Sequence, residues 1–181
     1  MKIFIMRHGE ASNQSLIPNK INKSNKINSD VLRPLTEQGK LEANKIGGWI
    51  ATMNIAGIKV DDIAVLVSPY LRAKQTCSHV VNALIEQGIQ LVGQPQTIDF
   101  ITPAGNIQQT HDFIDGILAE STPEIKAILL ISHMPFVSYL VAQLTNSQNM
   151  PIFATGAIAH IDYDMQLMQG QLVEMVSPEK V

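Results

Sequence analysis

Three short apolar runs, rich in β-branched residues, constrain the fold of this chain more than any other feature of its sequence. They are residues 2–6 (KIFIM), 63–67 (IAVLV) and 127–131 (AILLI), and polar residues bound each of them. Continuous apolar runs of this length are typical of strands buried on both faces, as in a parallel sheet. Helical patterns lie between the runs, and this alternation predicts an α/β fold.

The predicted helices fill the intervals between these strands. Thr36 is a good N-cap for the first of them, and Pro69 suits the first turn of the second. The four expected helices cover residues 36–53, 69–88, 105–120 and 135–144. Weaker strand candidates are residues 90–93, 157–163 and 172–176, with a hairpin turn over 164–171.

Length and composition define a broad class. A chain of 181 residues suggests one domain over residues 1–181, with the Asn-, Lys- and Ser-rich stretch 14–32 as an inserted surface loop. The net charge of −3 at pH 7 gives no sign of a nucleic-acid or membrane partner. Because neither a signal peptide nor a membrane-spanning run is found, we expect a cytoplasmic protein. Cys77 is the only cysteine, so it forms no intrachain disulfide and is expected to be buried.

Each of the three strong strands leads directly into residues that can carry chemistry. Arg7 and His8 follow the first strand, Arg72 lies in the first turn of the helix after the second, and His133 follows the third. In open parallel α/β sheets, ligands bind outside the carboxyl ends of the strands. The sequence therefore predicts that two arginines and two histidines meet in one crevice.

Such a cluster suits a phosphoryl group. Guanidinium groups donate planar pairs of hydrogen bonds to phosphate oxygens, and helix N-termini add backbone N–H groups. A neutral histidine in this positive field keeps its lone pair and can act as a nucleophile. We expect its other ring nitrogen to bond to a backbone carbonyl near Gly9, which fixes the tautomer.

Each of these residues alone is more often structural, so the prediction depends on the cluster. His79, His111 and His160 are not placed at a strand end in this way, and we interpret them as structural or exposed. No ligand spacing in the sequence supports a zinc site, so no metal is predicted.

Four motifs carry a resemblance to a known family. RHGEA, RPLTEQG, VSPYLRAKQT and ISHMPFV follow in this order and resemble the histidine phosphatase superfamily, whose best-known branch is phosphoglycerate mutase-like. The resemblance is strongest to the small SixA-type phosphohistidine phosphatases, through RPLT, TPAG and ISHMPFVSYLVAQL. It implies a three-layer α/β sandwich in which helices flank a mostly parallel sheet.

The resemblance also implies roles for individual residues. His8 matches the nucleophile that becomes phosphorylated, and Arg7 and Arg72 match the arginines that clamp the phosphate. His133 matches the second histidine of the pocket, which contacts the phosphoryl group. The family uses neither a metal nor an organic cofactor in this reaction.

Three further residues match positions that bind substrate or orient the site. Arg33 corresponds to an additional arginine of the SixA-type group that faces the phosphate. Glu10 and Ser68 correspond to positions that orient the nucleophile and its neighbours.

The sequence departs from the family pattern at the general acid. Many members carry a glutamate after the middle strand, but here the segment reads QTIDFITPAG, with Phe100 at the expected position and Asp99 beside it. This departure favours a phosphohistidine substrate, since an alkoxide leaving group needs a proton whereas a phosphoimidazole nitrogen can already carry one.

The sequence thus predicts a cofactor-independent phosphatase that acts through phospho-His8. Its expected substrate is phosphohistidine in a signalling or phosphorelay protein, such as a phosphotransfer domain. Three alternatives remain open. One is a phosphomonoesterase of the same superfamily that takes a small phosphate ester, another is a noncatalytic module that binds phosphoproteins, and the weakest is a metal hydrolase.

Overall fold

The computed structural model describes residues 1–13, 29–55, 62–120 and 125–181, and this part of the chain holds a six-stranded sheet. The strands are β1 (Lys2–Arg7), β2 (Ile63–Val67), β3 (Gln96–Thr97), β4 (Ala127–Ser132), β5 (Ile158–Asp164) and β6 (Gln169–Val176). Their order across the sheet is β3-β2-β4-β1-β5-β6. The pairs among β1 to β4 are parallel, whereas β5 runs antiparallel to both β1 and β6. The predicted α/β fold is confirmed, with a sheet that is more mixed than expected.

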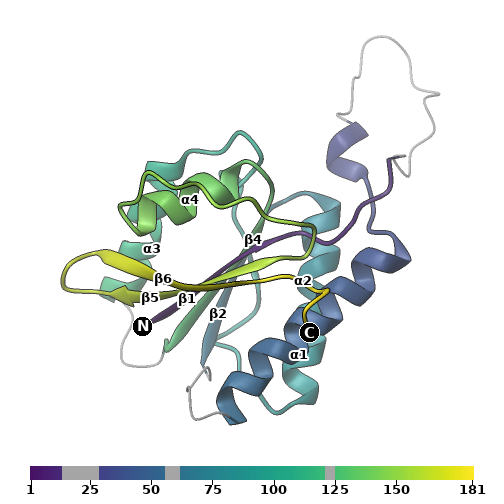
Figure 1. Cartoon of the computed structure of the whole chain (residues 1–181), viewed down its shortest axis with the longest axis horizontal. Coiled ribbons are helices and arrows are strands. Elements are labelled where there is room, and N and C mark those ends of the chain that lie inside the picture. Colours follow the sequence, from purple (N-terminus) through teal and green to yellow (C-terminus); the bar gives the residue numbers. More distant parts are fainter. Residues whose placement is uncertain (14–28, 56–61, 121–124) are drawn as a thin grey trace.

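Helices cover both faces of this sheet. They are α1 (Glu37–Ile55), α2 (Leu71–Glu86), α3 (Ile107–Glu120) and α4 (Phe136–Leu144), and a short 3-10 helix, η1, spans Ser29–Leu32. Figure 1 shows α1 and α2 side by side on one face, and α3 and α4 on the other. The molecule therefore has the three layers that the motifs imply.

The apolar runs are explained by a separate core on each face. In β1, Phe4 and Met6 pack under α1 and α2, whereas Ile3 and Ile5 pack under α3 and α4. Successive side chains of a strand point to opposite faces, so a strand covered on both sides needs apolar residues at every position. Cys77 is buried in the first of these cores, as predicted.

The expected elements are present, with small differences at their ends. The Thr36 hydroxyl accepts a hydrogen bond from the Gly39 amide at 3.1 Å, so Thr36 caps α1 as predicted. The weak strand candidate at 90–93 is wrong, because only Leu91 forms a single bridge there and the edge strand is β3. The expected hairpin turn is shorter, since β5 continues to Asp164 and β6 begins at Gln169.

Two expectations concern segments at the limits of this description. Residues 14–28 of the predicted surface loop lie outside the described residues, and its last four residues form η1. No helix in the described ranges is long and apolar enough to cross a membrane.

Candidate active site

The carboxyl ends of three neighbouring strands bring the predicted residues together. β4 lies between β1 and β2, and it pairs with both in parallel register. The amide of His8 donates to the Ser132 carbonyl at 2.9 Å, and the amide of Ser68 donates to the Ile131 carbonyl at 3.0 Å. The rings of His8 and His133 consequently lie 4.9 Å apart between centroids. The predicted convergence at this edge of the sheet is confirmed.

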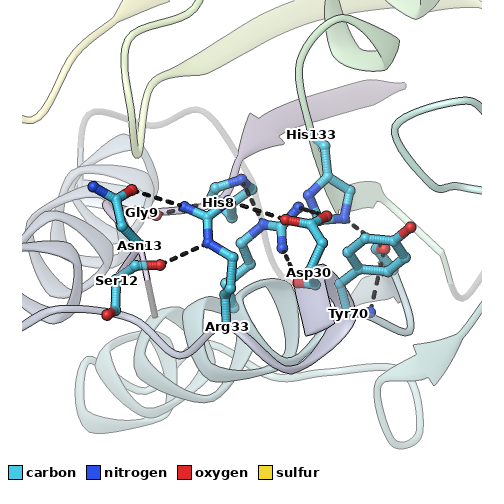
Figure 2. A network of polar contacts seen from close by, with 10 residues as sticks. His8, Gly9, Ser12, Asn13, Asp30, Arg33, Tyr70 and His133 are labelled. Atoms are coloured by element: carbon cyan, nitrogen blue, oxygen red, sulfur yellow. Dashed lines mark hydrogen bonds and ion pairs between the residues drawn. The ribbon is translucent and has the colours of Figure 1, made fainter. Parts of the chain in front are cut away.

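His8 is held in one tautomer by its neighbours. Its Nδ1 lies 2.7 Å from the Gly9 carbonyl oxygen, which can only accept, so Nδ1 carries the hydrogen. Its Nε2 accepts a hydrogen bond from Arg72 Nε at 3.1 Å. Figure 2 shows the ring between these contacts. The bond near Gly9 is the one that the sequence predicts, and it leaves the lone pair of Nε2 facing the site.

The same surroundings keep His8 neutral. Its pKa is lowered to about 4, chiefly because the side chain is buried, with only 8% of the residue exposed. The hydrogen bond to Gly9 opposes this shift, and the charges of Arg72, Arg7 and Arg33 add to it. Burial therefore lowers the pKa of His8 more than the positive charges, which the sequence alone makes the more visible cause. At neutral pH the ring therefore has a lone pair available for attack.

Two of the arginines meet on the carboxylate of Asp30, a residue of η1. Arg72 donates from Nη2 to Asp30 Oδ2 at 3.1 Å, and from Nη1 to the Asp30 backbone oxygen at 2.6 Å. Arg33 donates from Nη1 to Asp30 Oδ1 at 3.0 Å and from Nε to the Ser12 carbonyl at 2.6 Å. Burial raises the pKa of Asp30, but the bonds from both arginines outweigh this and lower it overall. Asp30 is therefore a carboxylate at neutral pH.

Arg7 and His133 each present one buried polar atom without a partner in the described structure. Arg7 donates from Nη1 to the Phe153 carbonyl at 2.7 Å, while its Nε is buried and unpaired. His133 Nε2 lies 2.7 Å from the Ser68 hydroxyl oxygen, while its Nδ1 is buried and unpaired. Buried polar atoms in folded proteins nearly always have partners. The ring nitrogens of His160 are also buried and unpaired, but only the Arg7 and His133 atoms lie among the charges around His8, where they suit a bound ligand.

His133 is neutral for the same reason as His8. Burial lowers its pKa to about 2, and the charges of His8, Arg72 and Arg7 act in the same direction. The Ser68 oxygen also accepts from the Tyr70 amide at 3.5 Å, which leaves the Ser68 hydrogen available to donate to His133 Nε2. This arrangement favours the tautomer in which Nδ1 carries the hydrogen and can donate to a ligand oxygen.

Direct backbone–backbone contact with α1 fixes the position of the loop after β1. A Cβ on Gly9 would lie 2.4 Å from the Gly39 carbonyl oxygen, and a Cβ on Gly39 would lie 2.1 Å from the Glu10 carbonyl oxygen. The Gly9 amide donates to Thr76 Oγ1 at 3.1 Å, and the Glu10 amide donates to Glu42 Oε2 at 2.8 Å. Both glycines are therefore required by the close approach that positions His8.

The described side-chain hydrogen bonds of the two histidines involve neither Glu10 nor Asp99. The Glu10 side chain is exposed, and its described contacts run through its backbone. Asp99 is exposed too, while Phe100 packs edge-on against Phe113 with ring centroids 5.5 Å apart. The assigned polar contacts of His8 involve neither carboxylate. The role suggested for Glu10 stays a prediction.

The other histidines have structural partners. His79 contacts Asn44, His111 contacts the Tyr163 hydroxyl at 2.8 Å, and His160 stacks on Phe4. Among the residues described, no group of three or more His, Cys, Asp or Glu side chains could hold a metal ion.

Sequence reasoning missed two residues that contact the arginines. Asp30 precedes Arg33 by three positions, a spacing that permits an ion pair but is also common in loops. Tyr70 lies two residues before Arg72, and its ring lies 4.9 Å from the Arg72 guanidinium carbon. Neither signal was distinctive enough to find the residue before the fold was known.

Fold and site together define a class of α/β proteins in which arginines surround a buried neutral histidine at the carboxyl edge of the sheet. The family model of the histidine phosphatase superfamily (branch 1) matches residues 3–92. Phosphohistidine phosphatase SixA of Escherichia coli (strain K12) is 34% identical over 164 residues, which are 91% of this chain and 86% of that protein. The chain therefore belongs to the histidine phosphatase superfamily, as its motifs predict.

Within this superfamily the similarity extends to further SixA proteins. The phosphohistidine phosphatase SixA homolog of Haemophilus influenzae is 32% identical over 165 residues, 91% of this chain and 89% of that protein. The solved structure of the protein histidine phosphatase SixA complexed with tungstate matches with a TM-score of 0.78 and 29% identity. That match covers 99% of both chains. The chain is thus of the SixA type along nearly its whole length.

Proposed function

We propose that this protein is a phosphohistidine phosphatase that works through a covalent phospho-His8 intermediate and needs no cofactor. The observation that carries the proposal is a buried neutral His8 whose Nε2 lone pair faces the Arg72 guanidinium. Two SixA relatives are named as phosphohistidine phosphatases, and a SixA structure holds tungstate, a tetrahedral oxyanion like phosphate.

The substrate phosphoryl group would bind by its oxygens to donors from three strand ends. Arg7 Nε and His133 Nδ1 are buried atoms of the site without a partner in the described structure, and each can donate to one oxygen. The Arg72 guanidinium offers a planar pair of donors beside His8 Nε2. Arg33, which directly follows η1, adds a second positive charge. Because both histidines are neutral, the positive charge that faces the dianion comes from the arginines.

In the first step, His8 Nε2 attacks the phosphorus in line with the bond to the leaving group. The new P–Nε2 bond forms as the P–N bond of the substrate phosphohistidine breaks, and the leaving imidazole departs with a proton on its other nitrogen. The hydrogen bond from Arg72 Nε to His8 Nε2 gives way, and Arg72 donates to the phosphoryl oxygens instead. The Gly9 carbonyl stabilises the positive charge that develops on the His8 ring.

In the second step, a water molecule attacks the phosphorus of phospho-His8. The P–Nε2 bond breaks, inorganic phosphate forms, and the lone pair of Nε2 is restored. Positioning and charge stabilisation account for most of the acceleration in such transfers.

The choice of a phosphohistidine substrate follows from the surroundings of the predicted general-acid position. Phe100 packs against Phe113, and the neighbouring Asp99 is exposed rather than held against His8. An ester substrate would need a positioned acid for its alkoxide, whereas a protonated imidazole leaves without one. We further propose that the chain forms one domain and acts in the cytoplasm. Its substrate would be a phosphotransfer domain of a phosphorelay.

The test compares a phosphorylated histidine phosphotransfer domain with a panel of phosphate esters as substrates. We expect faster turnover of the phosphohistidine protein, loss of that turnover in His8→Ala, and normal turnover in the matched variant His79→Ala. A strong preference for one ester would instead indicate a phosphomonoesterase. Binding of the phosphoprotein without turnover of any phosphate donor would indicate a noncatalytic module.

A further inference from the structure

The carboxylate of Asp30 takes up hydrogen-bond donors that a phosphoryl group on His8 would use. Its two oxygens accept from Arg33 and Arg72, the residues that lie beside the nucleophile (Figure 2). We propose that Asp30 is an internal anion that occupies the arginine clamp, formed by Arg33 and Arg72, until a phosphoryl group displaces it. Asp30 would thereby lower the affinity of the site for inorganic phosphate. This inference rests on the proposed function, because it takes His8 Nε2 as the site of phosphoryl transfer.

The inference depends on which hydrogen-bond donors of Arg72 face His8 and Asp30. The Nε and Nη2 hydrogens of a guanidinium point to the same side, and this edge is the one that pairs side-on with two oxygens of a phosphate. Here Nε donates to His8 Nε2 at 3.1 Å, and Nη2 donates to Asp30 Oδ2 at 3.1 Å. A phosphoryl group attached to Nε2 would place its oxygens along this same edge. Asp30 Oδ2 therefore competes with a phosphoryl oxygen for Nη2.

The backbone of η1 lets the carboxylate leave without releasing Arg72. The third contact of Arg72, from Nη1 to the Asp30 backbone oxygen at 2.6 Å, lies outside the edge that phosphate would use. The Asp30 side chain is 42% exposed, so rotation about its χ1 bond can carry it into solvent. The guanidinium then stays anchored while its phosphate-binding edge becomes free.

The charge on each anion determines which one binds the arginines more tightly. Asp30 brings one negative charge to a site with three arginine cations and two neutral histidines, whereas a phosphoryl dianion brings two. Competition of this kind raises the apparent Kd of every anion that needs the same edge, by the ratio of all clamps to open clamps. A phosphoprotein can offset that loss through contacts elsewhere on its surface. Inorganic phosphate has no other contacts, so its release is favoured.

The test is calorimetric titration of inorganic phosphate at pH 8, and separately of tungstate, into wild type and Asp30→Asn. We expect the variant to bind both ions about tenfold more tightly, the scale of one or two partly exposed ion pairs. The matched variant Asp112→Asn, which removes an exposed carboxylate on α3, should bind both ions as wild type does. Equal or weaker binding by Asp30→Asn would overturn the inference, because that result is expected if Asp30 only holds the two arginines in position.

Two further measurements separate the possible failures. In wild type, three-bond NMR couplings to Asp30 Cγ should report a change of χ1 rotamer on saturation with phosphate, and an unchanged rotamer would overturn the inference even if Asp30→Asn does not fold. If wild type binds neither ion, or binds them equally well after Arg72→Ala, the proposed function itself fails. Tight, Arg72-dependent binding that Asp30→Asn leaves unchanged refutes the internal anion alone.

Discussion

Replacing Gly39 with alanine should disable the site without touching a residue that meets substrate. Gly39 lies in the first turn of α1, and a Cβ there would be 2.1 Å from the Glu10 carbonyl oxygen and 2.7 Å from the Glu10 amide nitrogen. Ordinary van der Waals contact begins at 3.4 Å. Both opposing atoms belong to the backbone, so no side chain can turn aside, and the loop after β1 has to move by about 1 Å or more.

The size of the effect follows from what that loop carries. His8 is two residues from Glu10, and Gly9 packs against the Gly39 carbonyl on the other side of the same contact. A displacement of about 1 Å in a positioned nucleophile costs on the order of 100-fold in rate. Overpacking of this kind also lowers the free energy of unfolding by about 1–3 kcal/mol.

The assay measures kcat with a phosphohistidine substrate and the free energy of unfolding in urea. Gly48→Ala is the matched control in the same helix, because a Cβ at Gly48 would have no atom within 4 Å. That variant should keep the kcat of wild type and gain about 0.5–1 kcal/mol, the usual benefit of alanine over glycine in a helix. A Gly39→Ala protein with a wild-type kcat would refute the view that this contact positions His8.

Four further outcomes follow from the same structure. NMR of ring nitrogens should find His8 unprotonated at Nε2 at pH 6, and a pKa near the ordinary histidine value of 6.5 would contradict its burial. Because its folded pKa of about 4 lies below the unfolded value, the unfolded chain takes up the proton first. The free energy of unfolding should thus fall by about 3 kcal/mol between pH 6.5 and 4, a slope that His8→Asn should reduce in urea titrations. Thr36→Ala should lower the free energy of unfolding by about 1 kcal/mol through loss of the α1 cap. Ser68→Ala should move the proton between the His133 ring nitrogens, seen in their ¹⁵N shifts, and lower kcat more than it raises KM.

The strand ends that carry the site could be predicted, because a strand buried on both faces is a continuous apolar run in the sequence. The runs that form β1, β2 and β4 are apolar at nearly every position, and their first chemically active residues follow at once. The bond from His8 Nδ1 to the Gly9 carbonyl could be predicted as well, since a nucleophilic imidazole needs its other nitrogen fixed.

The remaining features depend on packing that the local sequence does not encode. β3 consists of two exposed polar residues, Gln96 and Thr97, so it has no apolar signature. Asp30 reaches Arg72 across 42 positions of sequence, and only the placement of η1 against α2 creates that contact. The main cause of the low pKa of His8 is burial, which residue types alone do not reveal.

Trapping phosphate on His8 tests the central claim most directly. A phosphohistidine substrate labelled in its phosphoryl group is mixed with excess protein, quenched in alkali within one turnover, and digested for mass spectrometry. The account predicts acid-labile phosphate on the peptide that contains His8, formed no more slowly than inorganic phosphate appears, and absent from His8→Asn. Release of inorganic phosphate with no label on His8, or with the label on His133 instead, would contradict it.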